Sequence, residues 1–252
     1  MQCNLAWVRH AGNVAWVRRA AASSQTRSVM STPRPQIPEA TIARLPSYLR
    51  ALVDLDGNGV TTVSSTELAE AAGVQSALLR RDLSHFGSYG TRGVGYEVPV
   101  LMREIGEHVG TGTVWPVLVV GVGNMGRALA HHGASLDVSF QVVAMVDSNP
   151  AIVGTTVAGI QVRDQSDLEA VVAECRPRIA IITTPPEAAQ QVCDRVVAAG
   201  VSSILNFAPV TLTIPEGATV RTVDLSQELQ ILAFHEARRE PATDADTKEL
   251  VR

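Results

Sequence analysis

The sequence is poor in cysteine, and its three cysteines exclude two kinds of site. Cys3, Cys175 and Cys193 are widely spaced, and none belongs to a Cys-x-x-Cys pair. An odd number of isolated cysteines argues against a disulfide framework and against a zinc site. Cys175 and Cys193 lie in apolar helical patterns, so we expect them in the core. This cysteine usage fits a reducing, cytoplasmic setting.

Long apolar runs and excess positive charge are also missing. No apolar run is long enough to cross a bilayer, so no membrane is expected as a partner. The formal net charge of −4 excludes a global attraction to nucleic acid, and any DNA-binding surface must be local. Every basic residue except Lys248 is arginine, which suits bidentate contacts to phosphate and guanine. With 252 residues, 46% of them hydrophobic, the chain can form two modest domains.

Residues 1–35 differ from the rest of the chain. They are rich in arginine, contain no acidic residue, and carry Ala-Trp-Val-Arg twice, at Ala6–Arg9 and Ala15–Arg18. A mitochondrial transit peptide would fit this composition. We favour a disordered extension, or upstream sequence with Met30 as the real start.

Residues 36–110 predict a helical DNA-binding domain. Apolar residues recur at helical spacing from Thr41, with Pro46 expected in a first turn or at a break. A capping box at Ser64–Glu67 opens a helix that ends at Gly73, and Ser76 is expected to cap a second helix. The spacing of Ala69, Gly73 and Leu79 fits a helix-turn-helix, although an ordinary helical hairpin fits the pattern almost as well. Arg80 and Arg81 would then project from the recognition helix.

The next segment favours the DNA-binding interpretation. Gly87–Tyr96 is dense in glycine with Arg92 near its tip, which predicts a β-wing that approaches phosphates or a minor groove. A linking helix over Val98–His108 and a domain boundary near Gly110 follow. Asp54–Gly59 imitates the start of a calcium loop, but Ser65 stands where calcium needs a bidentate glutamate, so we expect no metal.

Residues 111–224 predict a dinucleotide-binding domain. The apolar strand at Val117–Val120 runs into Gly121-Val122-Gly123-Asn124-Met125-Gly126, and a helix follows. This strand–turn–helix context is what the G-x-G-x-x-G motif requires. Gly121 would permit the tight turn, Gly123 the approach of a pyrophosphate, and Gly126 close packing of helix on strand. The pyrophosphate would lie at the helix N-terminus.

An aspartate ends the next predicted strand, Phe140–Val146. Asp147 follows Gly126 by about twenty residues, where the acid that binds a ribose 2′-hydroxyl is expected. A carboxylate there would repel a 2′-phosphate, which favours NAD(H) over NADP(H).

Two further strands end in loops that should face the same cleft, because ligands bind outside the carboxyl ends of parallel strands. The predicted nucleotide contacts in these loops are Thr183, Thr184, Pro185, Asn206, Phe207 and Ala208. Turn chemistry alone would also explain the two threonines. Finally, Leu225–Ala237 predicts a helix whose apolar stripe begins after the sheet is complete, which leaves surface for a partner. The polar tail, residues 240–252, is expected to be disordered.

Several blocks of the sequence together resemble the Rex family of bacterial redox-sensing transcriptional repressors. These blocks include Leu79–Ser84, Phe86–Tyr96, Ile204–Pro209 and Val223–Gln230. The wing block and Asn206–Pro209 are far more specific than the glycine motif. The resemblance spans residues 37–236. It implies an α/β chain with an N-terminal winged helix-turn-helix domain, a C-terminal Rossmann domain and a C-terminal helix, residues 225–239, exchanged in a homodimer. It also implies inverted-repeat operator DNA as partner, released when NADH rather than NAD⁺ is bound.

The resemblance further implies roles for individual residues. The expected DNA-binding residues are Ser64, Ser65, Ser76, Arg80, Arg81, Ser84, His85, Gly90, Arg92 and Gly93. An allosteric switch proposed in the family matches Arg50, Tyr96 and Asp224 here. His85 stands where the family more often has tyrosine.

Two other functions remain open from the sequence. A nicotinamide-dependent oxidoreductase needs a proton donor or acceptor beside the nicotinamide, and neither a Ser/Tyr/Lys nor a His/Asp constellation is apparent. A CoA-binding domain like that of acyl-CoA ligases would fit the glycine motif, but Asp147 and the wing argue against it. We therefore expect a sensor without catalytic residues.

Overall fold

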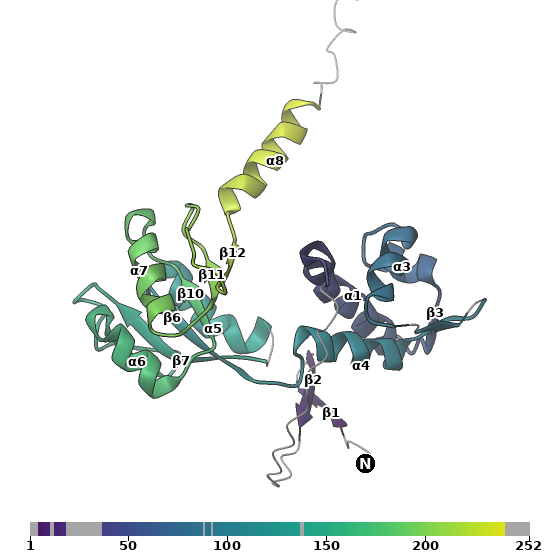
Figure 1. The fold of residues 1–252 in the computed structure, drawn as a ribbon, viewed down its shortest axis with the longest axis horizontal. Coiled ribbons are helices and arrows are strands. Elements are labelled where there is room, and N and C mark those ends of the chain that lie inside the picture. Colours follow the sequence, from purple (N-terminus) through teal and green to yellow (C-terminus); the bar gives the residue numbers. More distant parts are fainter. Residues whose placement is uncertain are drawn as a thin grey trace, which may run out of the picture. The chain divides into compact units, whose positions relative to one another are not determined.

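A computed structural model of the chain describes residues 5–10, 13–18, 37–87, 89–91, 93–136 and 139–239. The chain divides into two compact units between Val114 and Trp115 (Figure 1). We call the first unit, from residue 37, the head and the second the nucleotide unit. Two antiparallel strands precede the head, β1 (Leu5–His10) and β2 (Asn13–Arg18), with Trp7 paired to Trp16. The sequence did not predict this hairpin.

Four helices and a small sheet form the head. The helices are α1 (Glu39–Gly57), α2 (Ser65–Ala71), α3 (Ser76–Ser84) and α4 (Val98–Val109). Their core includes Leu52, Leu68, Leu79 and Leu101, all 0–1% exposed. Pro46 lies inside α1, so the expectation of a break or first turn there was wrong. Buried Leu45 and Tyr48 on either side hold the helix together although proline supplies no N–H.

Helix α2 begins as the sequence predicted. The Ser64 hydroxyl accepts a hydrogen bond from the Glu67 N–H (3.2 Å), and the Glu67 carboxylate accepts one from the Ser64 N–H (2.9 Å). Helix α3 differs, because its N-cap is Gln75 and Ser76 is the first helical residue. The Gln75 carbonyl already accepts the Leu79 N–H, which places the helix start one residue earlier than expected.

The wing is a short antiparallel hairpin. Strand β4 (Gly90–Thr91) pairs with β5 (Gly95–Glu97), and β5 also pairs with β3 (Thr62–Val63), which the sequence did not predict. Arg92, predicted at the wing tip, lies outside the described residues. After α4, Gly110 ends the helix in the left-handed conformation.

A seven-stranded sheet organises the nucleotide unit as the structure describes it. Its strand order is β12-β11-β10-β6-β7-β9-β8, with parallel pairing except between β8 and β9. The strands are β6 (Trp115–Val120), β7 (Phe140–Asp147), β8 (Thr156–Val157), β9 (Ile160–Asp164), β10 (Ile179–Ile182), β11 (Ser203–Asn206) and β12 (Thr219–Thr222). From β6 the chain adds β7 and β9 on one side, and it then crosses through α6 to β10 on the other side of β6. The glycine turn after β6 therefore lies where the strand order reverses, the usual ligand position in such sheets.

Helices cover the two faces of this sheet unequally. Helices α6 (Leu168–Cys175) and α7 (Pro186–Ala198) pack on one face, against Leu118, Val120 and Ile182. Helix α5 (Asn124–Leu136) packs on the other face, through Ala130 beside Val119 and Met145. A 3-10 turn, Gln165–Asp167, precedes α6, and the Asp164 carboxylate caps it by accepting the Ser166 N–H.

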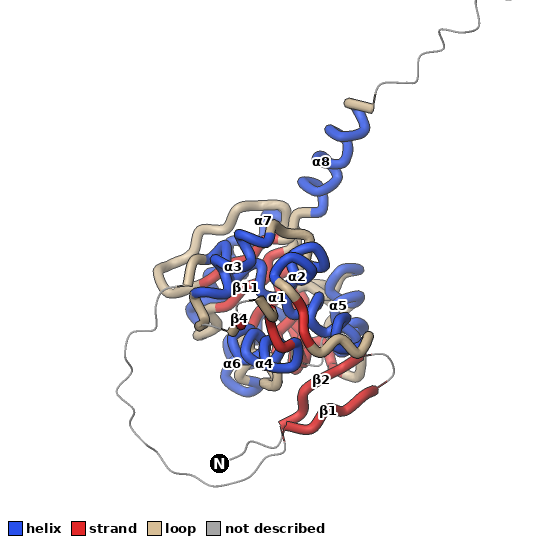
Figure 2. Tube along the Cα trace, turned by 90° about the vertical axis from the view of Figure 1, so that its right-hand side faces the viewer, coloured by secondary structure: helices blue, strands red, loops and turns tan. Residues whose placement is uncertain are grey.

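The last helix, α8 (Leu225–Ala237), has no buried residue within the chain. Figures 1 and 2 both show it standing away from the sheet. Its large apolar side chains are exposed, with Leu229 at 65% and Leu232 at 63%.

Candidate functional site

The three glycines of the turn after β6 meet three different surroundings. Gly121 has φ +93°, and a Cβ there would lie 2.9 Å from the Thr183 carbonyl. A Cβ on Gly126 would overlap the Gly121 carbonyl oxygen, whereas a Cβ on Gly123 would meet nothing within 4 Å. These surroundings are compatible with the functions that the motif predicts for the three glycines: a tight turn, an open approach, and close packing of helix on strand.

Charged side chains fix the turn from both sides. The Asp147 carboxylate, 8% exposed at the end of β7, accepts the Val122 N–H at 2.6 Å and the Asn149 N–H at 2.7 Å. The Arg127 Nε–H donates to the Val122 carbonyl at 3.1 Å. Each Asp147 oxygen accepts one of these bonds, and a carboxylate oxygen can accept a second. Asp147 can therefore hold the turn and still bind a sugar hydroxyl.

Thr183 and Thr184, predicted together, have different environments at the end of β10. The Thr183 hydroxyl contacts the Gly121 carbonyl at 2.6 Å and the Val120 carbonyl at 3.2 Å, so it stabilises the turn. The Thr184 hydroxyl is buried and finds no hydrogen-bond partner within the described part of the chain. An unpartnered buried hydroxyl is costly and is often explained by a ligand. Pro185, the N-cap of α7, is exposed beside it.

Asn206, predicted as a nucleotide contact, bonds to the backbone of its own loop. Its side chain is 0% exposed, donates to the carbonyls of Ala208 and Val210 at 3.0 Å, and accepts the Ala208 N–H at 2.9 Å. It therefore shapes the loop after β11 from within. The Gln190 amide, which the sequence analysis missed, holds the same loop through the N–H and carbonyl of Thr213, both at 2.9 Å. Phe207 remains half-buried in this loop and Ala208 is buried.

These features fit a dinucleotide at the carboxyl ends of β6, β7 and β10. The N-terminus of α5 favours a pyrophosphate because the first N–H groups of a helix have no partner within it. Gly123 leaves room for that group, Asp147 offers an acceptor for a ribose, and Thr184 offers a free hydroxyl. This arrangement can bind and orient a nucleotide.

The candidate DNA-binding surface lies on α2 and α3. Arg80 and Arg81 are exposed, and the Arg80 guanidinium donates to the Ser65 hydroxyl at the start of α2 (3.1 Å). The Ser84 hydroxyl donates to the Arg81 carbonyl at 2.6 Å, which leaves its oxygen able to accept only. Ser64, Ser76 and His85 are half-buried around this surface.

A buried ionic cluster that the sequence analysis missed lies beneath this surface. Asp82 of α3 is 1% exposed and accepts hydrogen bonds from Thr41, Arg44 and Tyr48 of α1. Burial acts to raise the pKa of Asp82, but the three donors outweigh it and hold the pKa below its usual range. Burial and the hydrogen bond to Asp82 raise the pKa of Tyr48 to about 12.

In the wing, Gly90 packs on a buried ring. A Cβ on Gly90 would lie 2.9 Å from the Tyr96 ring, and Tyr96 is 8% exposed. Burial raises the pKa of Tyr96. Gly93, with φ +84°, is exposed in the turn between the strands.

The three predicted switch residues lie in different settings. Tyr96 belongs to the head core, whereas Arg50 is exposed on α1. Asp224 caps α8 in the nucleotide unit by accepting the N–H groups of Ser226 (2.9 Å) and Gln227 (3.4 Å). The predicted switch thus involves residues of both units.

Within the described ranges, no helix is long and apolar enough to span a membrane. These ranges also hold no group of three or more His, Cys, Asp or Glu side chains placed to bind a metal ion.

Family models match both units. Residues 36–84 match the family described as "Putative DNA-binding protein N-terminus", and residues 113–210 match "CoA binding domain". The second match agrees with the Rossmann topology, and its description corresponds to the CoA alternative considered from the sequence.

Curated proteins and solved structures resemble the chain over most of its length. The redox-sensing transcriptional repressor Rex of Streptomyces griseus is 59% identical over 81% of this chain and 80% of its own, and that of Desulfitobacterium hafniense is 43% identical over 81% and 97%. Crystal structures of RSP, a Rex-family repressor, in complex with β-NAD⁺ and operator DNA and with β-NADH, match with TM-scores of 0.75 and 0.72. They are 33% and 32% identical, over 80% and 79% of this chain and 93% and 94% of theirs. On this evidence the chain belongs to the Rex family of redox-sensing transcriptional repressors.

Proposed function

We propose that this protein is a transcriptional repressor that binds operator DNA through its head and senses NADH and NAD⁺ in its nucleotide unit. The observation that carries the proposal is the joint presence of an arginine-bearing recognition helix and a dinucleotide glycine turn in one chain. The RSP structures with NAD⁺ plus operator DNA and with NADH support both halves. We place it in the cytoplasm with its DNA.

The head supports DNA binding through local charge. The whole chain is negative, but Arg80 and Arg81 stand exposed on neighbouring positions of α3. Guanidinium groups in a major groove bind phosphate oxygens and guanine edges. We assign Ser65, Ser84 and His85 to the same surface, and Gly90, Arg92 and Gly93 to a wing that contacts the DNA backbone.

The nucleotide unit supports NAD(H) over the alternatives. Asp147 places a negative charge where NADP(H) would bring its 2′-phosphate, so a free 2′-hydroxyl is favoured. The nucleotide binds as a sensed ligand, held by the glycine turn, Asp147 and Thr184. The oxidoreductase alternative loses support because the relatives are named as repressors.

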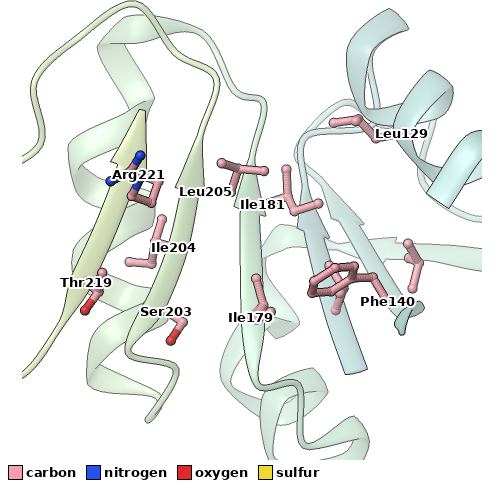
Figure 3. A pocket seen from close by; sticks show the side chains of 11 residues that line it. Leu129, Phe140, Ile179, Ile181, Ser203, Ile204, Leu205, Thr219 and Arg221 are labelled. Atoms are coloured by element: carbon pink, nitrogen blue, oxygen red, sulfur yellow. The ribbon is translucent and has the colours of Figure 1, made fainter. Parts of the chain in front are cut away.

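An exchanged helix would explain the exposed stripe of α8. The face of the sheet beside α5 carries an apolar hollow of about 340 Å³ over β10, β11 and β12 (Figure 3). It is lined by Ile179, Ile181, Leu205, Phe140 and Leu129, with Arg221 at its edge. We infer that α8 of a second copy covers apolar surface of this kind, which gives a homodimer for an inverted-repeat operator.

Redox sensing requires unequal binding to two states of the dimer. A nucleotide with equal affinity for the DNA-binding and the released state would shift nothing. We infer that NADH favours a state whose two heads no longer fit successive major grooves. Arg50, Tyr96 and Asp224 remain our candidates for the coupling between the units.

Replacing both recognition-helix arginines tests the assignment of the two activities. In Arg80→Ala/Arg81→Ala, operator binding in gel shifts should be lost while NADH binding by calorimetry stays unchanged, because the sites lie in different units. Arg163→Ala, which removes a half-buried arginine of β9 that pairs with Glu174 in the nucleotide unit, is the control and should bind DNA normally. If the double variant keeps operator binding, the head is misassigned.

A further inference from the structure

Beneath the recognition helix, the Asp82 carboxylate of α3 accepts four hydrogen bonds from three side chains of α1. Asp82 Oδ1 accepts bonds from the Thr41 hydroxyl (2.9 Å) and Arg44 Nη2 (2.7 Å). Asp82 Oδ2 accepts bonds from Arg44 Nε (2.6 Å) and the Tyr48 hydroxyl (2.7 Å). Each oxygen thus accepts two bonds, which fills its hydrogen-bonding capacity.

The donors come from one face of α1. Thr41, Arg44 and Tyr48 follow one another at spacings of three and four residues, which places them on one stripe of the helix. Arg44 contributes two parallel bonds, and this fork fixes direction as well as distance. Asp82 can satisfy all three only at one rotation of α3 about its axis.

The apolar contacts of α3 restrain its rotation with less directional precision. Leu79 and Leu83 are buried against the head core, and the hydrophobic effect that favours their burial is non-directional. Buried ion pairs contribute little net stability, and their best-attested use is to fix register. We therefore expect the Asp82 cluster to fix the orientation of α3 more than it stabilises the head.

Asp82 lies on the buried face of α3 with Leu79 and Leu83. Arg81 directly precedes it and Arg80 stands two positions before it, both exposed. At a helix radius of about 5–6 Å, a roll of about 20° displaces a side-chain end by roughly 2 Å. Such a displacement breaks a bidentate contact to a base edge but leaves a flexible arginine within reach of phosphates.

We infer that Asp82, held by Thr41, Arg44 and Tyr48, is a positioning residue that fixes the rotation of α3 and thereby sets operator specificity. The inference rests on the proposed DNA-binding function. It separates two properties of the head. Base discrimination depends on the cluster, whereas affinity for DNA of any sequence depends on the exposed arginines.

Graded variants of the full-length chain test this inference. Tyr48→Phe and Thr41→Val each remove one bond, Arg44→Lys keeps the charge but loses the fork, and Asp82→Asn removes the charge. Glu169→Gln is the matched control, because it breaks a two-bond pair with Arg195 (2.7 and 2.8 Å) that lies on the surface of the nucleotide unit. DNA sites are first enriched by the wild-type chain from a random-sequence duplex pool. Affinities for the enriched site and for a scrambled duplex are then measured over a range of salt concentrations.

The inference predicts a selective loss. Arg44→Lys and Asp82→Asn should bind the enriched site about 5-fold to 100-fold more weakly, the range that one lost bidentate base contact gives. Scrambled-duplex affinity and its salt dependence should stay within about twofold of wild type, since phosphate contacts set both. Tyr48→Phe and Thr41→Val should show the same selectivity loss to a smaller degree.

Three results would decide against the inference. An equal loss on both duplexes would show that the cluster supports only the fold of the head. Unchanged selectivity in the four variants would show that the rotation of α3 is fixed elsewhere. If Asp82→Asn unfolds, the two single-bond variants decide, and full wild-type selectivity in both overturns the inference. If the wild-type chain enriches no site, the proposed function fails instead.

Discussion

The Asp147 carboxylate accepts the backbone N–H of Val122 at 2.6 Å, which joins the end of β7 to the glycine turn after β6. The residue predicted to bind a ribose therefore also holds the turn that would receive the pyrophosphate. Because Asp147 has both functions, a substitution that removes its charge but keeps an acceptor oxygen can test the ribose contact while the turn is kept.

Asp147→Asn should weaken NADH binding by about 10-fold to 100-fold, the range for a lost charged hydrogen bond. The amide oxygen can still accept the Val122 N–H, although the amide NH2 can no longer accept the Asn149 N–H. The contact that joins β7 to the turn is thus kept, and operator binding without nucleotide should stay normal. Calorimetric titration with NADH measures the effect. Asp164→Asn, at the end of the neighbouring strand β9, is the control. Wild-type NADH affinity in Asp147→Asn would exclude the ribose contact.

Gly123→Ala and Gly126→Ala should fail in different ways. A Cβ on Gly126 overlaps the Gly121 carbonyl, so this variant should lose about 1–3 kcal/mol of unfolding free energy. A Cβ on Gly123 enters open space, so its stability should stay within about 0.5 kcal/mol while NADH binding weakens. Denaturant unfolding and NADH titration separate the two outcomes. Undiminished NADH binding by Gly123→Ala would show that no ligand approaches there.

The two threonines after β10 should respond with opposite signs in stability. Thr184→Val removes a buried hydroxyl without a partner in the described chain, so the nucleotide-free protein should gain up to about 1 kcal/mol. Thr183→Val loses the contact to the Gly121 carbonyl and should cost about 1 kcal/mol. NADH should bind Thr184→Val more weakly, by about fivefold for a hydrogen bond of about 1 kcal/mol. Equal NADH affinity in wild type and Thr184→Val would remove Thr184 from the site.

The head should lose stability in acid through Asp82. Because its folded pKa lies below the unfolded value of about 3.9, the ionised carboxylate stabilises the head at neutral pH. That contribution should fade as the pH falls below about 4 and disappear below the folded pKa. Urea unfolding of wild type and Asp82→Asn between pH 7 and pH 2 tests this. The difference in unfolding free energy between the two proteins should narrow only at the acid end. A difference that stays constant with pH would show that ionisation of Asp82 does not stabilise the head.

Elements that depend on residues close together in the sequence were predicted best. The buried runs at Val117–Val120 and Ile179–Ile182 predicted strands, and the glycine spacing predicted three distinct surroundings that the structure contains. The capping box at Ser64 and the helix over Leu225–Ala237 were also predicted, because caps and apolar stripes depend on residues three or four apart.

Contacts between distant residues escaped prediction. The Asp82 cluster joins positions up to 41 residues apart, and nothing near Asp82 in the sequence indicates its partners. Asn206 and Thr183 were placed at the correct loops, but only the structure shows that their side chains bond to the protein's own backbone. The two-residue strands β3 and β8 are too short to show a hydrophobic alternation.

The central claim is that NADH releases this protein from its operator. The most direct measurement is a gel shift of the wild-type chain on a duplex from upstream of its own gene, titrated with NADH and with NAD⁺ in parallel. NADH should dissociate the complex at concentrations where NAD⁺ leaves it intact, and Asp147→Asn should shift the NADH midpoint upward. Operator affinity that does not change with NADH would show that the protein is not released by NADH.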